Sequence, residues 1–277
     1  MPELPEVEIV VQCLNRIVTG RTIVSAELRR QRLAPDLKPR SFASRLKHTR
    51  ILSVHRRGKF ILFQLDNKRT LLAHLRMSGR FMLLDHDQED PKFAHAIFHL
   101  DGDDRLVFRD QRHFGLMKIV ETTGLYSTKE LAKLAPEPFS DEFTVEYLTH
   151  ALKSSKRNIK LLLLDQTKVC GVGNIYASEA MFIARINPMR SAYQVSRPKI
   201  AALHGAVREV MKETLALGKN MGIDPENIGG NIYGSNASPE WRVYGREGES
   251  CPRCAKPISR IVQGGRSTFY CRRCQRK

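Results

Sequence analysis

Four of the six cysteines form two closely spaced pairs near the carboxyl end of the chain. The pairs are Cys251-Pro-Arg-Cys254 and Cys271-Arg-Arg-Cys274, separated by sixteen residues. A pair at this spacing can turn both sulfurs toward one ion, and tetrahedral zinc takes four such ligands. Two disulfides or a redox-active pair are the alternatives, but no secretory signal accompanies the cysteines. We therefore expect one structural Zn²⁺.

A glycine-rich turn, Gly171-Val-Gly-Asn174, stands between two segments of helical pattern. Glycine lets a backbone approach an anion closely, and the unpaired N–H groups at a helix start bind phosphate. Asn174 adds a side-chain donor, and Lys156, Arg157 and Lys160 lie just upstream. Such turns are common and often only structural. Beside the basic cysteine segment, this one predicts a helix–hairpin–helix grip on a DNA backbone.

The first eight residues, Met1-Pro-Glu-Leu-Pro-Glu-Val-Glu, combine an amine with carboxyl groups. We expect removal of Met1, which would expose the secondary amine of Pro2. An α-amino group has a pKa of about 8, against about 10 for lysine, so a useful fraction is unprotonated at neutral pH. Pro2 could attack a sugar C1′ while Glu3 or Glu6 protonates the opening ring. Taken alone, the segment is more typical of a helix that follows acidic residues.

Hydrophobic periodicity indicates the elements that would position these groups. A helix is predicted over 5–19, and Val-, Ile-, Leu- and Phe-rich strands follow. The strands are Thr22–Leu28, Ile51–His55, Phe60–Leu65, Thr70–Leu75, Ala94–Leu100, Arg105–Arg109 and Leu116–Val120. Further helices are predicted over 142–152, 159–164, 175–184 and 198–217. Residues 218–240 carry five glycines and little periodicity, which is typical of a loop or linker.

The charge of the chain indicates a polyanionic partner. Forty-six Lys and Arg stand against 29 Asp and Glu, a formal charge of +17 with a sequence pI near 9.9. Residues 241–277 alone hold ten basic and two acidic side chains. Nucleic acid is the favoured partner, with anionic lipid or a merely soluble basic protein as alternatives. No apolar run approaches the roughly 18 residues that cross a bilayer, so we expect a cytoplasmic, nucleoid-associated protein.

These patterns predict an α+β multidomain protein with three parts. A strand-rich domain, a sandwich or barrel, covers 1–130 and a helical DNA-binding domain covers 131–240. A small zinc ribbon covers 241–277, where the turn between the cysteine pairs presents Arg266 to phosphate.

Three segments together carry a resemblance to a known family. Pro2–Glu8, Gly171–Glu179 and Gly265–Gln275 occur in the order, and over the full length, that is typical of formamidopyrimidine-DNA glycosylases. The resemblance implies an N-terminal β-sandwich flanked by helices, a helix–two-turn–helix domain and a zinc finger. It also implies a monomer that binds double-stranded DNA.

The resemblance assigns roles to individual residues. Pro2 resembles the nucleophile that forms a Schiff base, and Glu3 the acid beside it. Lys59 resembles a lysine that donates a proton during strand cleavage, although it could be an ordinary hairpin lysine. Arg266 resembles the zinc-finger arginine that contacts phosphate and assists the second elimination.

Two further segments, His74-Leu-Arg-Met77 and Asp110-Gln-Arg112-His-Phe114, resemble the DNA-contacting loops of the family. There the family fills the gap left by a flipped nucleotide with Met, Arg and Phe, here Met77, Arg112 and Phe114. An unstacked gap costs a few kcal/mol, which an apolar wedge reduces. Without the resemblance, core packing would be the preferred interpretation of Met77 and Phe114.

The chain departs from the family pattern at two places. Phe93 stands where the family often has a DNA-contacting histidine. The loop that caps an everted oxidised purine usually carries a Gly-Gly-Thr-Thr-Leu run, and here the stretch is Ile228-Gly-Gly-Asn-Ile-Tyr-Gly234. The second departure weakens the inference of an oxidised-purine substrate more than it weakens the inference of excision chemistry.

The sequence thus predicts a bifunctional glycosylase and lyase that removes oxidised purines, 8-oxoguanine and formamidopyrimidines, from duplex DNA. An endonuclease VIII-like enzyme for oxidised pyrimidines is the first alternative, and Leu4 in place of glycine argues against it. A non-catalytic zinc-ribbon DNA-binding paralogue is the second, and Pro2, Glu3 and Lys59 argue against that. No organic or redox cofactor and no membrane partner are expected.

Overall fold

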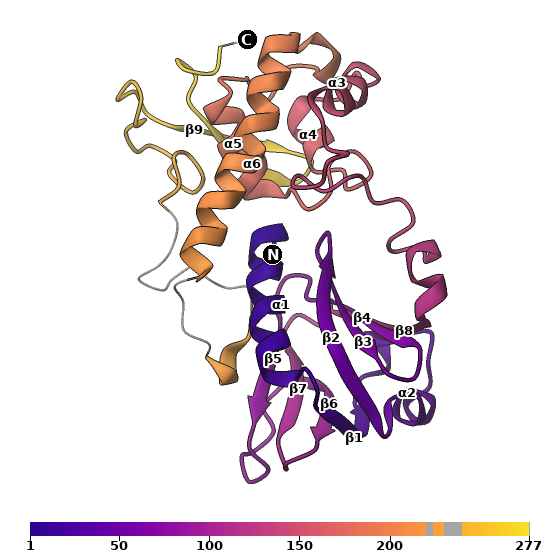
Figure 1. The fold of residues 1–277 in the computed structure, drawn as a ribbon. Coiled ribbons are helices and arrows are strands. Elements are labelled where there is room, and N and C mark those ends of the chain that lie inside the picture. Colours follow the sequence, from indigo (N-terminus) through magenta and orange to yellow (C-terminus); the bar gives the residue numbers. More distant parts are fainter. Residues whose placement is uncertain (220–223, 230–239, 277) are drawn as a thin grey trace. The chain divides into compact units, whose positions relative to one another are not determined.

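The computed structural model describes residues 1–219, 224–229 and 240–276, which form two compact units (Figure 1). Of the described residues, the first unit comprises Met1–Ala132, 218–219 and 224–229, and the second Lys133–Leu217 and 240–276. Among the described residues, no helix is both long and apolar enough to cross a membrane.

An eight-stranded antiparallel sheet dominates the first unit. Its order is β5-β7-β6-β1-β2-β3-β4-β8. The strands are β1 Thr22–Leu28, β2 Thr49–Arg57, β3 Phe60–Leu65, β4 Arg69–His74, β5 Gly79–Leu84, β6 Ala94–Leu100, β7 Arg105–Asp110 and β8 Leu116–Glu121. The seven predicted strands are confirmed to within two residues at either end. Apolar runs of strand length explain the agreement: β1 and β2 alternate in burial, whereas β3, β4 and β6 are buried along most of their length.

The sheet folds into two four-stranded halves that face each other. β1 and β2 join the halves through only two residue pairs, and both strands carry a register irregularity beside the junction. Phe63 on one half meets Phe81 on the other with ring centroids 5.5 Å apart. Both rings belong to one buried cluster that also takes in the first helix. The arrangement is the expected sandwich.

Two elements of this unit were not predicted. Helix α2, Pro39–Leu46, buries only Phe42 and Leu46. Two apolar positions are too few to show a helical period in the sequence. Strand β5 begins at Gly79, where a side chain would lie 2.5 Å from the carbonyl oxygen of Leu75 and 2.8 Å from the Phe108 ring. Close packing therefore requires a glycine at this position.

The short segment 224–229 pairs with β5. The backbones of Phe81 and Ile228 exchange two hydrogen bonds of 2.9 Å, and Ile228 is buried in the sandwich core. The sequence analysis placed this segment in the helical domain. It packs on the first unit instead. The core buries the Ile228 side chain, and the Ile228 backbone hydrogen-bonds to the otherwise exposed edge of β5.

The second unit contains helices and a small hairpin. The elements are α3 Val145–Lys153, α4 Ile159–Leu163, α5 Asn174–Ile183, α6 Arg197–Lys219, β9 Ser259–Gln263 and β10 Arg266–Tyr270. Helix α3 begins three residues later than predicted because Thr144 caps it, accepting the N–H of Tyr147 at 3.0 Å. The buried Glu179 carboxylate accepts three backbone N–H groups, from Arg242, Val243 and Tyr244, which fastens α5 to the start of the cysteine module.

Candidate active site and nucleic-acid interface

The amine-bearing end of the chain is held by the first turn of α1, Leu4–Val18. Glu6 accepts the backbone N–H of Glu3 at 2.7 Å, one arm of a capping box. Both carboxyl groups are buried, Glu3 with 2% and Glu6 with 0% of the residue exposed. Pro2 is half-buried and Met1 is exposed. The sequence therefore builds a rigid, acid-lined helix start directly behind the residue predicted to be the nucleophile.

Lys59 lies in the tight turn between β2 and β3, where Gly58 has a positive φ of 59°. The residue is buried, with 6% exposed. Arg56 ties this turn to the first helix: its guanidinium donates to Glu8 at 2.8 Å and to the carbonyl of Gly58 at 3.2 Å. The Glu8–Arg56 pair thus places the predicted amine and the predicted ammonium at the same edge of the first unit.

His74, at the end of β4, is buried beside this turn. Its ring meets Phe60 edge-on at 4.7 Å, and its Nδ1 accepts the N–H of Arg76 at 2.9 Å. Burial, with the nearby charges of Arg76 and Lys59, lowers the pKa of His74 to about 3. His74 is therefore neutral, and the structure gives it the role of shaping the Arg76–Met77 turn rather than that of a cation for DNA.

We expect His74 to make the first unit sensitive to acid. The unfolded chain takes up this proton near pH 6.5, whereas the folded ring resists it until about pH 3. The free energy of unfolding should therefore fall as the pH drops through that window, by about 1.4 kcal/mol per pH unit at most. His74→Asn, which keeps an acceptor, should flatten the dependence in urea titrations between pH 7 and 5. The exposed His86→Asn is the control, and an unchanged slope in the His74 variant would contradict the assignment.

The three residues predicted to fill a gap in DNA lie on two exposed turns. Met77 is 43% and Phe114 47% exposed, so neither belongs to the core. The Arg112 guanidinium lies 5.2 Å from the centre of the Phe114 ring. Arg76 and His113, immediately before Met77 and Phe114, have positive φ values of 55° and 61°. Such backbone costs about 1–3 kcal/mol per residue and is typical of functional turns.

A buried carboxylate that the sequence analysis did not single out holds both turns. Asp110, fully buried, accepts from the Ser78 hydroxyl, from the N–H of Gly115 at 2.7 Å and from the N–H of Arg112 at 3.2 Å. Ser78 in turn accepts the Arg112 N–H at 3.0 Å. One carboxylate therefore joins the turn of Met77 to the turn of Arg112 and Phe114. The signal in the sequence was an acid among basic residues, directly after the apolar centre of β7, Leu106-Val-Phe108.

Asp110→Asn should loosen both turns. An amide replaces one acceptor oxygen with a donor, so at least one buried N–H or hydroxyl loses its partner, at a cost of roughly 1–3 kcal/mol in the free energy of unfolding. Affinity for lesion-containing duplex should fall by about tenfold, on the scale of that cost, while affinity for undamaged duplex changes less. Filter binding with both duplexes measures this. Asp103→Asn, in an exposed loop, is the matched control, and equal losses on both duplexes would argue against the role.

Phe93, at the first departure from the family pattern, packs within the same part of the unit. The ring centroids of Phe93 and His113 are 5.6 Å apart, and the Lys92 Nζ lies 5.3 Å from the centroid of the Phe93 ring. His113 also lies 2.8 Å from His95, whose Nε2 is 2.9 Å from the carbonyl oxygen of Asp110. Phe93 thus packs against His113 in the turn that presents Phe114, and it offers no polar contact of its own.

In the second unit, the predicted phosphate grip consists of the glycine turn and the first turn of α5. Gly171 has a positive φ of 81°, and Gln166 fixes the turn by accepting from the Gly171 N–H at 2.9 Å and donating to Val172 at 2.8 Å. Gly173 is the N-cap residue of α5, so the turn leads directly into the positive end of the helix dipole. Asn174 donates to the carbonyl of Ser267 at 3.0 Å, and its buried Oδ1 has no hydrogen-bond partner among the described residues.

Lys160 corrects a sequence prediction. The residue is fully buried, and its ammonium donates to the Ser267 carbonyl at 3.0 Å and to the Thr268 hydroxyl. Lys160 therefore anchors the hairpin of the cysteine module and is not placed to contact a DNA backbone. Lys156 is exposed, as a phosphate contact requires. Arg266, one residue before the anchored Ser267, is exposed and has no ion pair among the described residues.

The four cysteine sulfurs converge as a metal site requires. All lie within 4.8 Å of one another, and two pairs are separated by 3.9 Å and 3.5 Å, Cys251 to Cys274 and Cys254 to Cys271. Tetrahedral zinc with Zn–S bonds of about 2.3 Å places sulfurs about 3.8 Å apart, whereas a disulfide needs about 2 Å. The predicted cysteines fit one structural Zn²⁺.

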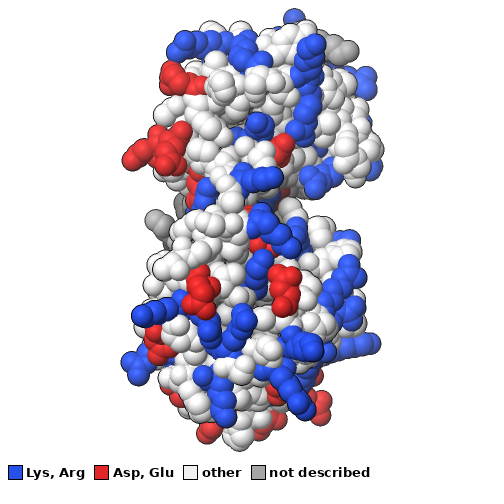
Figure 2. All heavy atoms as spheres, turned by 90° about the vertical axis from the view of Figure 1, so that its right-hand side faces the viewer, with Lys and Arg blue, Asp and Glu red and all other residues white. Residues whose placement is uncertain are grey.

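Basic side chains cover much of the surface on the face shown in Figure 2, where Lys and Arg are more prominent than Asp and Glu. Positive charge of this extent favours a polyanion over an uncharged ligand. The four-cysteine finger, the exposed turns of Met77 and Phe114 and the excess of basic side chains are together typical of a nucleic-acid-binding protein, here one with an acid-lined amino terminus.

Comparison with known proteins identifies the family. The formamidopyrimidine-DNA glycosylase N-terminal domain matches residues 1–117, its H2TH domain residues 134–225, and the zinc finger found in FPG and IleRS residues 248–276. Formamidopyrimidine-DNA glycosylases of Ruegeria sp. and Listeria innocua are 40% and 39% identical to the chain, each over the full length of both proteins. The chain belongs to the formamidopyrimidine-DNA glycosylase family, which confirms the resemblance. It is a DNA glycosylase of a family whose members also cleave abasic sites.

Solved structures agree with this assignment. A mutant of the Lactococcus lactis enzyme, in complex with Fapy-dG-containing DNA, has a TM-score of 0.91 and 32% identity, with full coverage of both chains. The wild-type L. lactis enzyme in complex with DNA containing an oxidised pyrimidine has a TM-score of 0.90 and 32% identity, again over both full chains.

Proposed function

We propose that this glycosylase excises oxidised purines through a Schiff base on Pro2 and then cleaves the strand by β- and δ-elimination. Once Met1 is removed, the Pro2 nitrogen attacks C1′, the glycosidic bond breaks and the damaged base leaves. Protonation of the ring oxygen by Glu3 opens the sugar and forms the iminium. Loss of a C2′ proton then breaks the C3′–O bond, and a further elimination breaks the C5′–O bond.

The observation that carries this proposal is the tie between Glu8 and Arg56. The 2.8 Å ion pair fixes the turn of Lys59 against the helix that begins behind Pro2. Lys59 can then exchange protons in the eliminations, and Glu6 orders the first turn so that Glu3 stays in place. Burial of Glu3 and Lys59 costs folding free energy, and such groups gather at functional sites. A paralogue that only binds DNA would gain nothing from burying these two ionisable side chains.

The similar solved structures support a damaged base as the substrate and include both a purine-derived and a pyrimidine-derived lesion. The L. lactis enzyme has been captured with DNA containing Fapy-dG and with DNA containing an oxidised pyrimidine. Of the altered capping loop, only Ile228 and Gly229 lie within the described residues, and residues 230–234 lie outside them. We retain 8-oxoguanine and formamidopyrimidines as the proposed substrates, and Met77, Arg112 and Phe114 as the wedge.

The partner is duplex DNA, which we propose the enzyme meets as a monomer at the bacterial nucleoid. Lys156, Asn174 and Arg266 would hold the backbone. Zinc, bound by the four cysteines, supplies folding free energy to the finger and takes no part in the chemistry. The three domains that we propose are 1–130, 131–240 and 241–277, with 224–229 packed on the first.

A nicking assay over a panel of lesions tests the proposal. Duplexes would carry 8-oxoguanine, a formamidopyrimidine, thymine glycol or a bare abasic site at the same position. We expect the two purine lesions to be excised fastest and the abasic site to be nicked at both sides of the sugar. Faster excision of thymine glycol would favour the endonuclease VIII-like alternative. Failure to nick the abasic duplex would favour the DNA-binding paralogue.

A further inference from the structure

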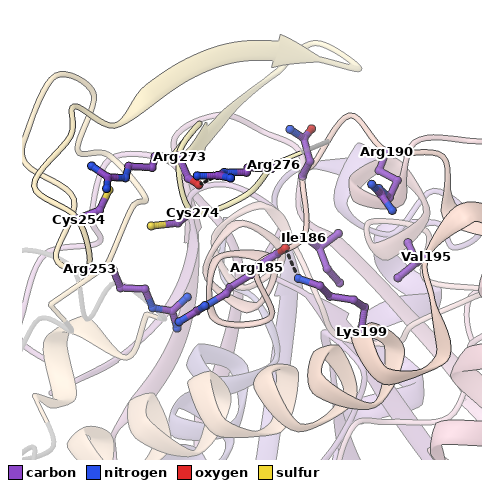
Figure 3. Close-up of a pocket in the computed structure, with 11 residues that line it drawn as sticks. Arg185, Ile186, Arg190, Val195, Lys199, Arg253, Cys254, Arg273, Cys274 and Arg276 are labelled. Atoms are coloured by element: carbon purple, nitrogen blue, oxygen red, sulfur yellow. Dashed lines mark hydrogen bonds between the residues drawn. The ribbon is translucent and has the colours of Figure 1, made fainter.

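A cationic pocket of about 500 Å³ lies beside the zinc finger, within the second unit (Figure 3). Six basic side chains and no acidic side chain line it. These are Arg185, Arg190, Lys199, Arg253, Arg273 and Arg276. Its volume lies within the roughly 300–1,000 Å³ of small-molecule sites. The glycosylase reaction as proposed above uses none of these residues.

Two of the cations are already committed to the protein. Arg253 donates to the carbonyl oxygens of Phe182 and Ile183, at 2.7 and 3.2 Å, and stacks over the Phe182 ring. Lys199 donates to the carbonyls of Ala184 and Arg185, at 3.2 and 2.7 Å. Both cations therefore close the carboxyl end of α5, where the helix dipole is negative. This explains two of the six charges.

Arg276 also donates to a backbone carbonyl oxygen, that of Arg273, at 3.3 Å. The other three cations have no such explanation. Arg185, Arg190 and Arg273 form no ion pair with a carboxylate in the part of the chain that the structure describes. Their charge is also felt by Lys199, because burial and then the charges of Arg185 and Arg190 lower the pKa of its ammonium. A bound anion would reduce this repulsion between positive side chains.

The zinc centre accounts for only part of the charge. Cys254 and Cys274 reach the wall of the pocket. Four thiolates and one Zn²⁺ carry a formal charge of −2, which balances only two of the six positive charges. Nor does the phosphate grip explain them, since it lies at the amino end of α5. That helix has ten residues, so its two ends are about 15 Å apart.

We propose that this pocket binds a compact diphosphate-type anion, independently of the duplex held by the glycine turn and Arg266. Guanidinium groups bind phosphate oxygens in pairs, which suits two adjacent phosphate groups better than a single carboxylate. No aromatic side chain lines the pocket, so phosphate groups, and not a stacked base, are the part of a ligand that it recognises.

Calorimetric titration of inorganic pyrophosphate into the zinc-loaded, full-length protein tests the proposal. The titration would be run at constant ionic strength, with and without a saturating short duplex that carries a non-cleavable abasic analogue. We expect one pyrophosphate per chain under both conditions. The variant R190Q/R273Q should bind at least about tenfold more weakly, because each substitution removes a charge-assisted hydrogen bond. R208Q/K212Q, on α6 outside the pocket, removes the same charge and should bind as the parent does.

Zinc content and thermal melting would show that both double variants are folded, and the single variant R190Q serves if R273Q weakens the finger. Equal affinity of the parent and R190Q/R273Q would overturn the proposal. So would displacement of pyrophosphate by the duplex, since the pocket would then be a part of the DNA interface. An equal loss in both double variants would reduce the effect to overall charge and would also overturn it.

Discussion

Replacing Pro2 by glycine should abolish the covalent complex that borohydride traps on lesion-containing DNA. Glycine leaves a primary amine on a flexible residue, without the ring that fixes the direction of the nitrogen lone pair ahead of α1. The rate of excision should fall by roughly 10³-fold or more, as expected when a covalent nucleophile is lost. Denaturing gels of the trapped complex and single-turnover excision on an 8-oxoguanine duplex measure the two effects.

Pro5→Ala is the matched control for this experiment. Pro5 occupies the first turn of α1 and is buried, so its loss tests the helix start without altering the amine. We expect trapping to survive in Pro5→Ala with a small loss of stability. A Pro2→Gly enzyme that is still trapped at the parent rate would show that another amine forms the Schiff base. Mass spectrometry of the parent must show an amino terminus at Pro2, since a retained Met1 would block the nitrogen.

Removing the zinc should cost nearly all specific DNA binding. The finger buries few apolar side chains of its own: its small core consists of Val243, Ile258 and the cysteines, packed against Phe182. Structural Zn²⁺ contributes on the order of 10 kcal/mol to the folding of such modules. Without the metal the hairpin unfolds, and Arg266 and the anchor at Ser267 lose their position. We expect affinity for an abasic-analogue duplex to fall at least about 100-fold, a loss of about 2.7 kcal/mol.

The variant Cys271→Ser makes the same test without a chelator. Plasma emission spectroscopy should find one zinc per chain in the parent and none in the variant. Cys13→Ala is the control, because Cys13 is half-buried on α1 and lies outside the four-sulfur cluster. It should keep both the metal and the affinity. A Cys271→Ser protein that binds DNA as the parent does would rule out a finger that needs its metal to hold DNA.

Much of the candidate site could be predicted because it depends on short-range spacing. Each cysteine pair, the glycine turn and the amino-terminal motif are all shorter than a dozen residues, and their chemistry follows from residue type. The strands of the sandwich were predictable for a similar reason, since short runs rich in Val, Ile, Leu and Phe between turn residues indicate strands. The comparisons confirm the family, and the cluster of sulfurs supports the zinc.

The remaining features depended on residues that are distant in the sequence. Lys160 looks like a phosphate contact until the fold brings it to Ser267, 107 positions away, and buries it. Asp110 gains its role only when Ser78, 32 positions earlier, lies beside it. Burial and partner choice are properties of packing, so periodicity cannot disclose them.

The sequence by itself therefore determined the family and the metal ligands, because those depend on residue identity and local spacing, and on the same grounds it predicts the kind of nucleophile. Only the tertiary structure decided which charges are buried and which turns are held rigid, and whether a basic side chain faces solvent. The cationic pocket is the clearest case. Its lining comes from residues 185–199 and from the two cysteine turns, and no stretch of sequence contains it.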